Sequence, residues 1–319
     1  MFTDSLRIPV IGAPLFVISN PALVRAQAEA GIIGAFPSLN ARPVSLLDEW
    51  LHELNGLPFA VNLIVHKTND RLEQDLALVV KWRVPLVITS LGAREDVNQA
   101  IHSYGGTVLH DIINNRYAHK AIEKGADGLI AVAAGAGGHA GTWSPFALIQ
   151  EIRAWFDGPI ALSGSIATGA SVLAAEVMGA DVAYIGSAFI ATKEANAAEA
   201  YKQMIVESSA EDIVYSNLFT GVHGNYLEGS IRKAGFDPEH LPVSEPSKMD
   251  FGQSKVWRDI WGCGQGIGAI REIPTVAGLV DRLEREYRAA AAKMVASHEE
   301  GIGPGSRYQR AGVRPNKTP

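Results

Sequence analysis

The stretch PIALSGSIATGASVLAAEVMGADVAYIGS, residues 159–187, decides the fold of this protein. It reads as a strand at Pro159–Leu162, a turn, a helix, the phrase Gly179-Ala180-Asp181 and a second strand at Val182–Gly186. Both strands are continuous apolar runs, as expected where both faces of a parallel sheet are buried. Gly179 is placed to end the helix in a left-handed conformation before the next strand. The stretch is therefore one strand, helix, strand unit of a parallel sheet.

The same unit recurs throughout the preceding sequence. Six further apolar runs precede this stretch: Ile8–Gly12, Ile32–Phe36, Pro58–Leu63, Pro85–Thr89, Thr107–His110 and Gly128–Val132. Their starts lie about 25 residues apart, the length of one strand, one crossover helix and two loops. The phrase Gly125-Ala126-Asp127 ends another helix in the same way, which marks the repeat as structural. Eight units predict an α/β protein with a closed (β/α)8 (TIM) barrel, and an eight-stranded open doubly wound sheet is the alternative.

The chain divides into three parts by composition. Residues 1–200 are predicted to form the barrel core. Residues 201–272 are rich in Gly, Pro, His and Asn and lack a steady apolar period, which is typical of a lid or a substrate-side segment. Residues 273–319 contain a helical apolar stripe from about Thr275 to Ala296 and then a tail. We expect this C-terminal helix to close the barrel.

Composition excludes several function classes. With 47% hydrophobic residues, the chain of 319 residues is not a disordered protein. The 28 Lys and Arg against 34 Asp and Glu give a net charge of −6 without a basic block, which argues against nucleic-acid or anionic-membrane binding. Cys263 is the only cysteine, so neither an intrachain disulfide nor a multi-cysteine metal site can form. The N-terminus lacks the apolar segment of a signal peptide, and a cytoplasmic location is expected.

The loop after the sixth strand carries the most specific local pattern. Active sites of such barrels lie at the carboxyl ends of the strands, and there the sequence reads AAGAGGHAG, residues 133–141. Gly137 and Gly138 let the backbone approach a ligand, and His139 places one imidazole at the strand exit. A flexible turn with a surface histidine is the structural alternative. A dinucleotide-binding loop is disfavoured because Asp157 precedes the next strand, whereas the ribose-binding acid should close it.

Polar groups end several other strands. The turns Ser163-Gly164-Ser165-Ile166 and Gly186-Ser187 follow the seventh and eighth strands, where such barrels hold phosphate, and they indicate a phosphorylated cofactor. Ala13 follows the first strand and offers a small group beside a flat ring. Asn62 is an amide within an apolar run, and its hydrogen-bond partners could come from a cofactor ring or from the backbone.

Metal and serine-hydrolase chemistry are not predicted. His110-Asp111 ends the fifth strand without further clustered ligands, so no metal site is expected. Ser163 and Ser165 lack the G-x-S-x-G pattern of a nucleophile elbow. A second glycine-dense stretch at residues 261–268 includes Gln265 and Gly266, and a loop so free of side chains could lie over a ring.

With these motifs the sequence resembles the nitronate monooxygenase family, formerly called 2-nitropropane dioxygenases, which are FMN-dependent (β/α)8 barrels. The motifs that carry the resemblance follow in the family's order: Ala13-Pro14, Asn62, Gly137-Gly138-His139, Ser163-Gly164-Ser165-Ile166, Gly186-Ser187 and Gly264-Gln265-Gly266. The resemblance covers most of the chain.

The resemblance implies a role for each of these residues. Ala13 would bring backbone near the isoalloxazine, and Asn62 would form a hydrogen bond with the flavin ring. His139 would face the substrate side of the ring, and Gln265 and Gly266 would cover the flavin. The FMN phosphate would be held by Gly164, Ser165, Gly186 and Ser187. The implied reaction is the oxidation of alkyl nitronates with O2 to a carbonyl compound and nitrite. With an ordinary pKa of about 6.5, His139 could donate as an imidazolium or, when neutral, take an α-proton. The partners would be a small-molecule substrate and O2, and the apolar late segment leaves a homodimer open.

Two departures from the family pattern keep other reactions open. Many members have a glutamate before the glycine pair and a lysine after the histidine of the fifth strand, whereas this chain has Ala136 and Asp111. The same barrel and Gly-Gly-His signature occur in flavin-dependent enoyl-acyl carrier protein reductases and in NAD(P)H:quinone reductases. An NAD(P)H-dependent flavin reductase is therefore the first alternative, and a flavin-binding module without turnover is the second.

Overall fold

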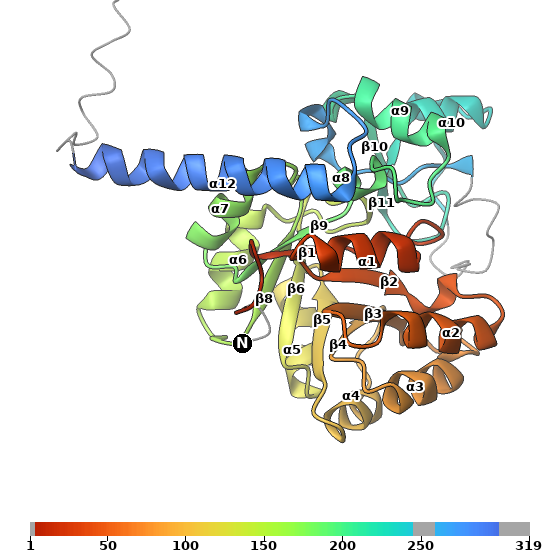
Figure 1. The fold of residues 1–319 in the computed structure, drawn as a ribbon. Helices are drawn as coiled ribbons and strands as arrows, with labels where there is room; N and C mark the ends of the chain where they lie inside the picture. Colours follow the sequence, from red (N-terminus) through yellow and green to blue (C-terminus); the bar gives the residue numbers. More distant parts are fainter. Residues whose placement is uncertain (1–3, 245–258, 300–319) are drawn as a thin grey trace, which may run out of the picture.

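The computed structural model describes residues 4–244 and 259–299, and eight parallel strands form a ring with helices around it (Figure 1). The strands are β1 (Val10–Gly12), β2 (Gly34–Pro37), β3 (Phe59–Ile64), β4 (Leu86–Ser90), β5 (Thr107–Ile112), β6 (Gly128–Val132), β8 (Ile160–Ser163) and β9 (Val182–Ile185). They pair in the order β1-β9-β8-β6-β5-β4-β3-β2, and a parallel bridge between Ile11 and Ile33 joins β1 to β2. Each strand overlaps its predicted run, and the (β/α)8 barrel is confirmed.

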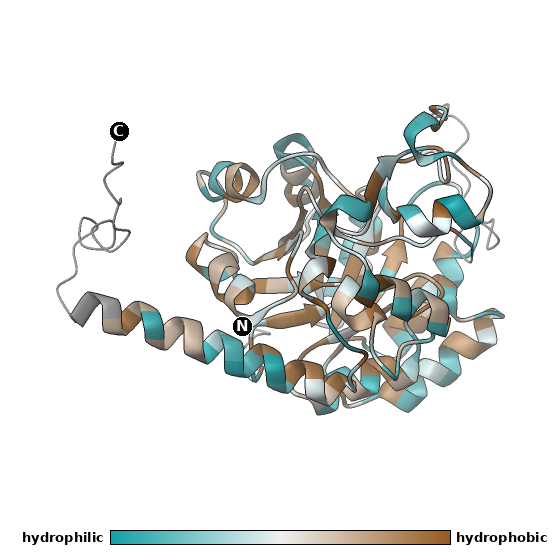
Figure 2. Ribbon diagram, turned by 90° about the horizontal axis from the view of Figure 1, so that it is seen from above, coloured by the Kyte–Doolittle hydropathy of each residue, from teal (hydrophilic) through white to brown (hydrophobic). Residues whose placement is uncertain are grey.

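Seven crossover helices and one late helix surround the ring. The crossover helices are α1 (Pro21–Glu29), α2 (Val44–Leu54), α3 (Leu72–Lys81), α4 (Glu95–His102), α5 (Asn115–Glu123), α6 (Pro145–Arg153) and α7 (Gly169–Val177). The helix after β9, α8 (Ser187–Ile190), is too short to cover the ring, and α12 (Val276–Glu299) packs against α7 and α1 instead. The C-terminal helix thus lies against the helices on either side of the short α8, and the far half of α12 extends beyond the barrel (Figures 1 and 2).

The repeated Gly-Ala-Asp phrase has a structural role. Gly125 and Gly179 have φ values of 86° and 107°, the left-handed conformation that ends each helix. The carboxylate of Asp127 then accepts from the backbone N–H of Val108 at 2.7 Å, and that of Asp181 accepts from the N–H of Ile160 at 2.7 Å. Each phrase thus fastens the start of its own strand to the start of the neighbouring strand.

Inside the ring, the side chains nearer the amino ends of the strands are apolar, and those nearer the carboxyl ends are polar. Alternate residues of each strand point inward, and Ala60, Ile88, Leu109, Ala161 and Val182 are buried in one inner cluster. Figure 2 shows hydrophobic strand segments within the barrel. Two positions nearer the carboxyl ends, the same strands carry polar groups: Asn62, Ser90, Asp111, Ser163 and Tyr184. This polar layer forms the floor of the candidate site.

The later chain forms a small structure of its own beside the carboxyl ends. It comprises α9 (Glu199–Glu207), β10 (Ile213–Ser216), β11 (Gly224–Leu227) and α10 (Glu228–Lys233), with short 3-10 turns, among them η5 (Gln265–Ala269). Strand β11 pairs with β10 and with β7 (Gly138–His139). Part of the predicted lid, residues 245–258, lies outside the described residues, so the boundaries 201–272 and 273–319 stay predictions. No described helix has both the length and the apolar composition to cross a bilayer.

Candidate active site

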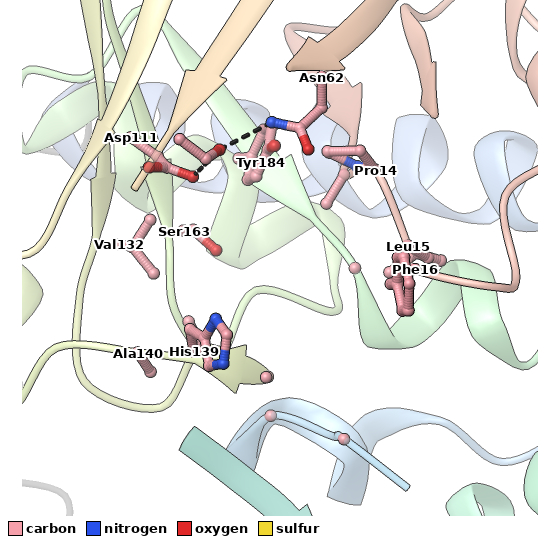
Figure 3. Close-up of a pocket in the computed structure, with 18 of the residues that line it drawn as sticks. Pro14, Leu15, Phe16, Asn62, Asp111, Val132, His139, Ala140, Ser163 and Tyr184 are labelled. Carbon is pink, nitrogen blue, oxygen red and sulfur yellow. Dashed lines mark hydrogen bonds between the residues drawn. The ribbon is translucent and has the colours of Figure 1, made fainter. Parts of the chain in front are cut away.

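A cavity of about 590 Å³ opens at the carboxyl ends of the barrel strands. Its size is in the range of small-molecule sites. Asn62, Asp111, His139 and Leu15 come from different strands and loops and border the same space (Figure 3). The polar residues that the sequence places at the ends of separate strands therefore line one cavity.

The two glycine-serine turns line this cavity together. Ser163, Gly164 and Ser165 follow β8, and Gly186 and Ser187 follow β9, the strand next to it. Gly164 has a φ of 138°, and a Cβ there would lie 2.8 Å from the carbonyl oxygen of Ala134. The turn can therefore form only with glycine at this position.

The two glycine-dense stretches pack against each other, backbone to backbone. A Cβ on Gly137 would lie 2.8 Å from the backbone nitrogen of Gly264, and a Cβ on Gly264 would lie 2.6 Å from the carbonyl oxygen of Gly135. The N–H of Gly264 also donates to the Ser187 hydroxyl at 2.9 Å. Residues 262–266 are thus bound to the loops after β6 and β9, and glycine is needed because no side chain fits between them.

The candidate cofactor-binding residues do not all reach the cavity. Those that line it are Ala13, Asn62, Gly137, Gly138, Ser163, Gly164, Ser165, Gly186, Ser187 and Gly266. Gln265 does not line it: its backbone N–H donates to the carbonyl of Gly135 at 2.9 Å, and its side chain is exposed. Gln265 therefore holds the loop by its backbone.

His139 lines the cavity as part of β7. The pairing of β7 with β11 sets Gly224 opposite His139, so the later chain fixes the position of this histidine. Its Nε2 lies 3.0 Å from the hydroxyl oxygen of Thr220. That hydroxyl donates its hydrogen to the carbonyl of Val222 at 3.0 Å, so it can only accept from His139. When this hydroxyl accepts, the proton of the neutral imidazole is on Nε2 and Nδ1 is the basic nitrogen.

Burial keeps the imidazole neutral. Desolvation lowers the pKa of His139 to about 4, because a charged ring would lose its hydration in this position. Of the two states that the sequence allowed, the neutral one prevails at physiological pH. The surface-histidine alternative is ruled out, since His139 is half-buried against the cavity.

A hydrogen-bonded chain crosses the floor. The amide nitrogen of Asn62 donates to the carbonyl of Ile88 at 3.1 Å and to the hydroxyl of Ser90 at 2.7 Å. The Ser90 hydroxyl donates in turn to Oδ2 of Asp111 at 2.5 Å (Figure 3). Desolvation raises the pKa of Asp111 to about 6, and the Ser90 hydrogen bond opposes this rise. Protein groups thus satisfy the amide nitrogen of Asn62, and its oxygen remains for a ligand.

Several cavity residues were not singled out from the sequence. Ser90 ends β4 one residue past the predicted run, and Tyr184 is the one hydroxyl-bearing side chain within the run Val182–Gly186. Both follow the inward alternation of their strands, which could have found them. His223 lines the cavity, and Thr220 contacts His139 without lining it. Both lie in the irregular late segment, where no periodicity indicates which side chain turns to the site.

Metal and thiol chemistry find no support in the described residues. Among them, no three His, Cys, Asp or Glu side chains gather as potential metal ligands. Cys263 is fully buried, and burial raises the pKa of its thiol to about 12, which disfavours the nucleophilic thiolate.

Comparisons with known proteins agree with this arrangement. The sequence model of the family described as nitronate monooxygenase matches residues 37–286. The nitronate monooxygenase of Paraburkholderia phytofirmans is 24% identical, over 90% of this chain and 94% of that protein. Two solved structures share the fold: nitroalkane oxidase from Streptomyces ansochromogenes (TM-score 0.80, 23% identity, 92% of this chain and 99% of that chain) and FabK from Thermotoga maritima (TM-score 0.78, 23% identity, 92% and 97%). Because the family match extends over most of the barrel and the later segment, the chain belongs to the nitronate monooxygenase family of flavin-dependent oxidoreductases.

Proposed function

We propose that this protein binds FMN and oxidises alkyl nitronates with O2 to a carbonyl compound and nitrite. The observation that supports this most is that the two glycine-serine turns and His139 line a single cavity. A nitronate is an electron-rich anion, so the protein needs mainly to place its α-carbon against the cofactor. A small-molecule substrate and O2 are the partners that this reaction requires.

The residues present fit FMN. The turns at Gly164-Ser165 and Gly186-Ser187 would hold the phosphate through backbone N–H groups and hydroxyls, and the close approach at Gly164 leaves room for no side chain. The oxygen of Asn62 would accept from an N–H of the ring, because the amide nitrogen is already bonded. Bound FMN supplies the redox chemistry.

His139 would act as an acceptor of protons. Its neutral imidazole carries the proton on Nε2, toward Thr220, so Nδ1 would take the α-proton of a neutral nitroalkane. A preformed nitronate has already lost that proton, and for it His139 would serve to position the substrate. The oxidation of a neutral nitroalkane should therefore depend more strongly on His139 than the oxidation of a nitronate.

Two measurements test the proposal. The absorption spectrum of the purified protein should show the bands of oxidised flavin. Ethylnitronate should then be oxidised with uptake of O2 and release of nitrite, and His139→Asn should leave a yellow, folded protein with much reduced turnover. A colourless protein, or an unchanged kcat/KM of His139→Asn on ethylnitronate, would contradict the assignment of cofactor or of histidine, respectively.

Anaerobic mixing with NADH separates the proposed reaction from the alternatives. Rapid bleaching of the flavin would favour an NAD(P)H-dependent quinone or enoyl-thioester reductase. Bleaching by ethylnitronate alone would favour the nitronate oxidation. A flavin that neither compound reduces would indicate a binding module without turnover.

A further inference from the structure

The carboxyl group of Asp111 stands on the cavity floor without a counter-ion. Asp111 is half-buried, its open part faces the cavity, and no ion pair of the described residues includes it. Lys120 on α5 is the only Lys or Arg among the cavity-lining residues, and it forms no ion pair with Asp111. The carboxyl group thus relies on the cavity itself for solvation.

The polarity of the floor chain is fixed at each link. The carbonyl of Ile88 can only accept, so the nitrogen of the Asn62 amide must face it. The Ser90 hydroxyl accepts from that nitrogen and therefore gives its own hydrogen to Oδ2 of Asp111. The remaining oxygens, Oδ1 of Asn62 and Oδ1 of Asp111, receive no hydrogen bond from the described residues.

These two oxygens are both acceptors when Asp111 is ionised, and the free hydroxyl donors of the floor, Ser163 and Tyr184, come from the other strands β8 and β9. One ring N–H can satisfy Asn62, but the neighbouring acceptors of a flavin ring would then meet a bare carboxylate. An uncharged ring laid over the floor would also remove the water that solvates the carboxylate, at a cost that favours the neutral acid. A carboxylic acid at this position would instead donate a hydrogen bond to the ring.

We propose that Asp111 binds a proton when FMN occupies the cavity, and that its neutral carboxyl group donates to the flavin ring from Oδ1. The proton comes from solvent, and no bond other than O–H forms. This inference rests on the proposed flavin binding and makes Asp111 a specificity-determining residue for the cofactor.

The groups that face Asp111 are compatible with this proton uptake. Tyr184 from β9 interacts with it electrostatically, and burial raises the pKa of that phenol well above 10, so it stays uncharged. His139 on β7 is neutral. In the preceding residue, His110, the Nδ1 atom lies 2.6 Å from the hydroxyl oxygen of Thr89. Burial lowers the pKa of His110 to about 4. None of the three supplies the positive charge that would keep a carboxylate ionised.

Calorimetry counts the proton directly. FMN is titrated into the full-length protein freed of flavin at pH 7, in two buffers that differ in ionisation enthalpy. Because a carboxyl group with a pKa of about 6 is mostly ionised in the free protein, wild type should take up nearly one proton more than Asp111→Asn. The FMN phosphate titrates identically in both proteins, so the difference isolates Asp111. Ser90→Ala keeps the carboxyl group but removes the hydrogen bond that opposes its raised pKa, so the free variant should already hold part of the proton at pH 7 and its uptake should fall between those of wild type and Asp111→Asn.

The pH dependence of wild type gives a second, variant-free measurement. Since FMN favours the protonated form, its Kd should rise up to tenfold per pH unit above pH 6. Equal proton uptake in wild type and Asp111→Asn, or a Kd that does not rise over pH 6–8, would overturn the inference while leaving FMN binding intact. Absence of any FMN binding would overturn the inference and the proposed function together.

Discussion

The Nε2 atom of His139 lies 3.0 Å from the hydroxyl oxygen of Thr220, a residue 81 positions later in the chain. When the hydroxyl hydrogen is given to the carbonyl of Val222, the hydroxyl accepts from His139 and the imidazole proton lies on Nε2. A residue of the irregular late segment therefore contacts the histidine that lines the cavity.

Thr220→Val should lower kcat/KM on neutral nitroethane by about 10- to 100-fold, because a misplaced or wrongly protonated base loses much of its catalytic contribution. Preformed ethylnitronate should be affected less, since it needs no proton removal. Steady-state kinetics on both substrates measure this split, and Thr220→Ser, which keeps the hydroxyl, should stay near wild type. An equal loss on both substrates would show that Thr220 only supports the loop.

The reaction with neutral nitroethane should depend on pH through the lowered pKa of His139. The neutral imidazole is the active form, and with a pKa of about 4 it is almost fully present above pH 6. We therefore expect a flat kcat/KM from pH 6 to pH 8 and a decrease toward pH 4. A rise centred near pH 6.5 would mean that the imidazole titrates as if exposed to water. His139→Asn serves as the control, since its residual rate should lack the acid limb.

Gly137→Ala should reduce the FMN content of the purified protein. The new methyl group would lie 2.8 Å from the backbone nitrogen of Gly264 and would separate the two glycine-dense stretches that border the cavity. Gly268→Ala is the matched control, because a Cβ at Gly268 meets nothing within 4 Å. The ratio of flavin absorbance to protein absorbance measures the effect, and equal flavin content in both variants would contradict it.

Gly169→Ala should destabilise the closure of the barrel. A Cβ at Gly169 would lie 2.1 Å from the carbonyl oxygen of Leu283 and 2.2 Å from the nitrogen of Tyr287, so α7 and α12 would have to move apart. Overpacking of this kind costs about 1–3 kcal/mol of the free energy of unfolding, and the melting temperature should fall by several degrees.

Gly278→Ala is the control for this stability measurement. It lies within α12, is exposed, and its nearest contact would be 3.3 Å from the Thr275 hydroxyl, so alanine should be neutral or slightly stabilising there. The melting temperature should therefore fall in Gly169→Ala and stay unchanged or rise slightly in Gly278→Ala. A wild-type melting temperature for Gly169→Ala would mean that α12 does not press on α7 at this point.

The strands and the convergence of their ends follow from the sequence. A parallel strand buried on both faces must be continuously apolar, and all parallel strands of one ring end at the same rim. Gly164-Ser165 and Gly186-Ser187 end neighbouring strands, and they line one cavity. The late helix was visible as an apolar stripe, and the shortness of α8 explains why it is needed.

The tertiary structure alone decided which side chains complete the site. Ser90 links Asn62 to Asp111 only because three adjacent strands turn those residues inward at the same height. Thr220 contacts His139 only because β11 pairs with β7, and residues 216–224 have no apolar periodicity that predicts this pairing. Local patterns fix where strands and helices lie, since they depend on neighbouring residues. Hydrogen bonds between residues far apart in the chain depend on register and side-chain direction, which only the assembled fold sets.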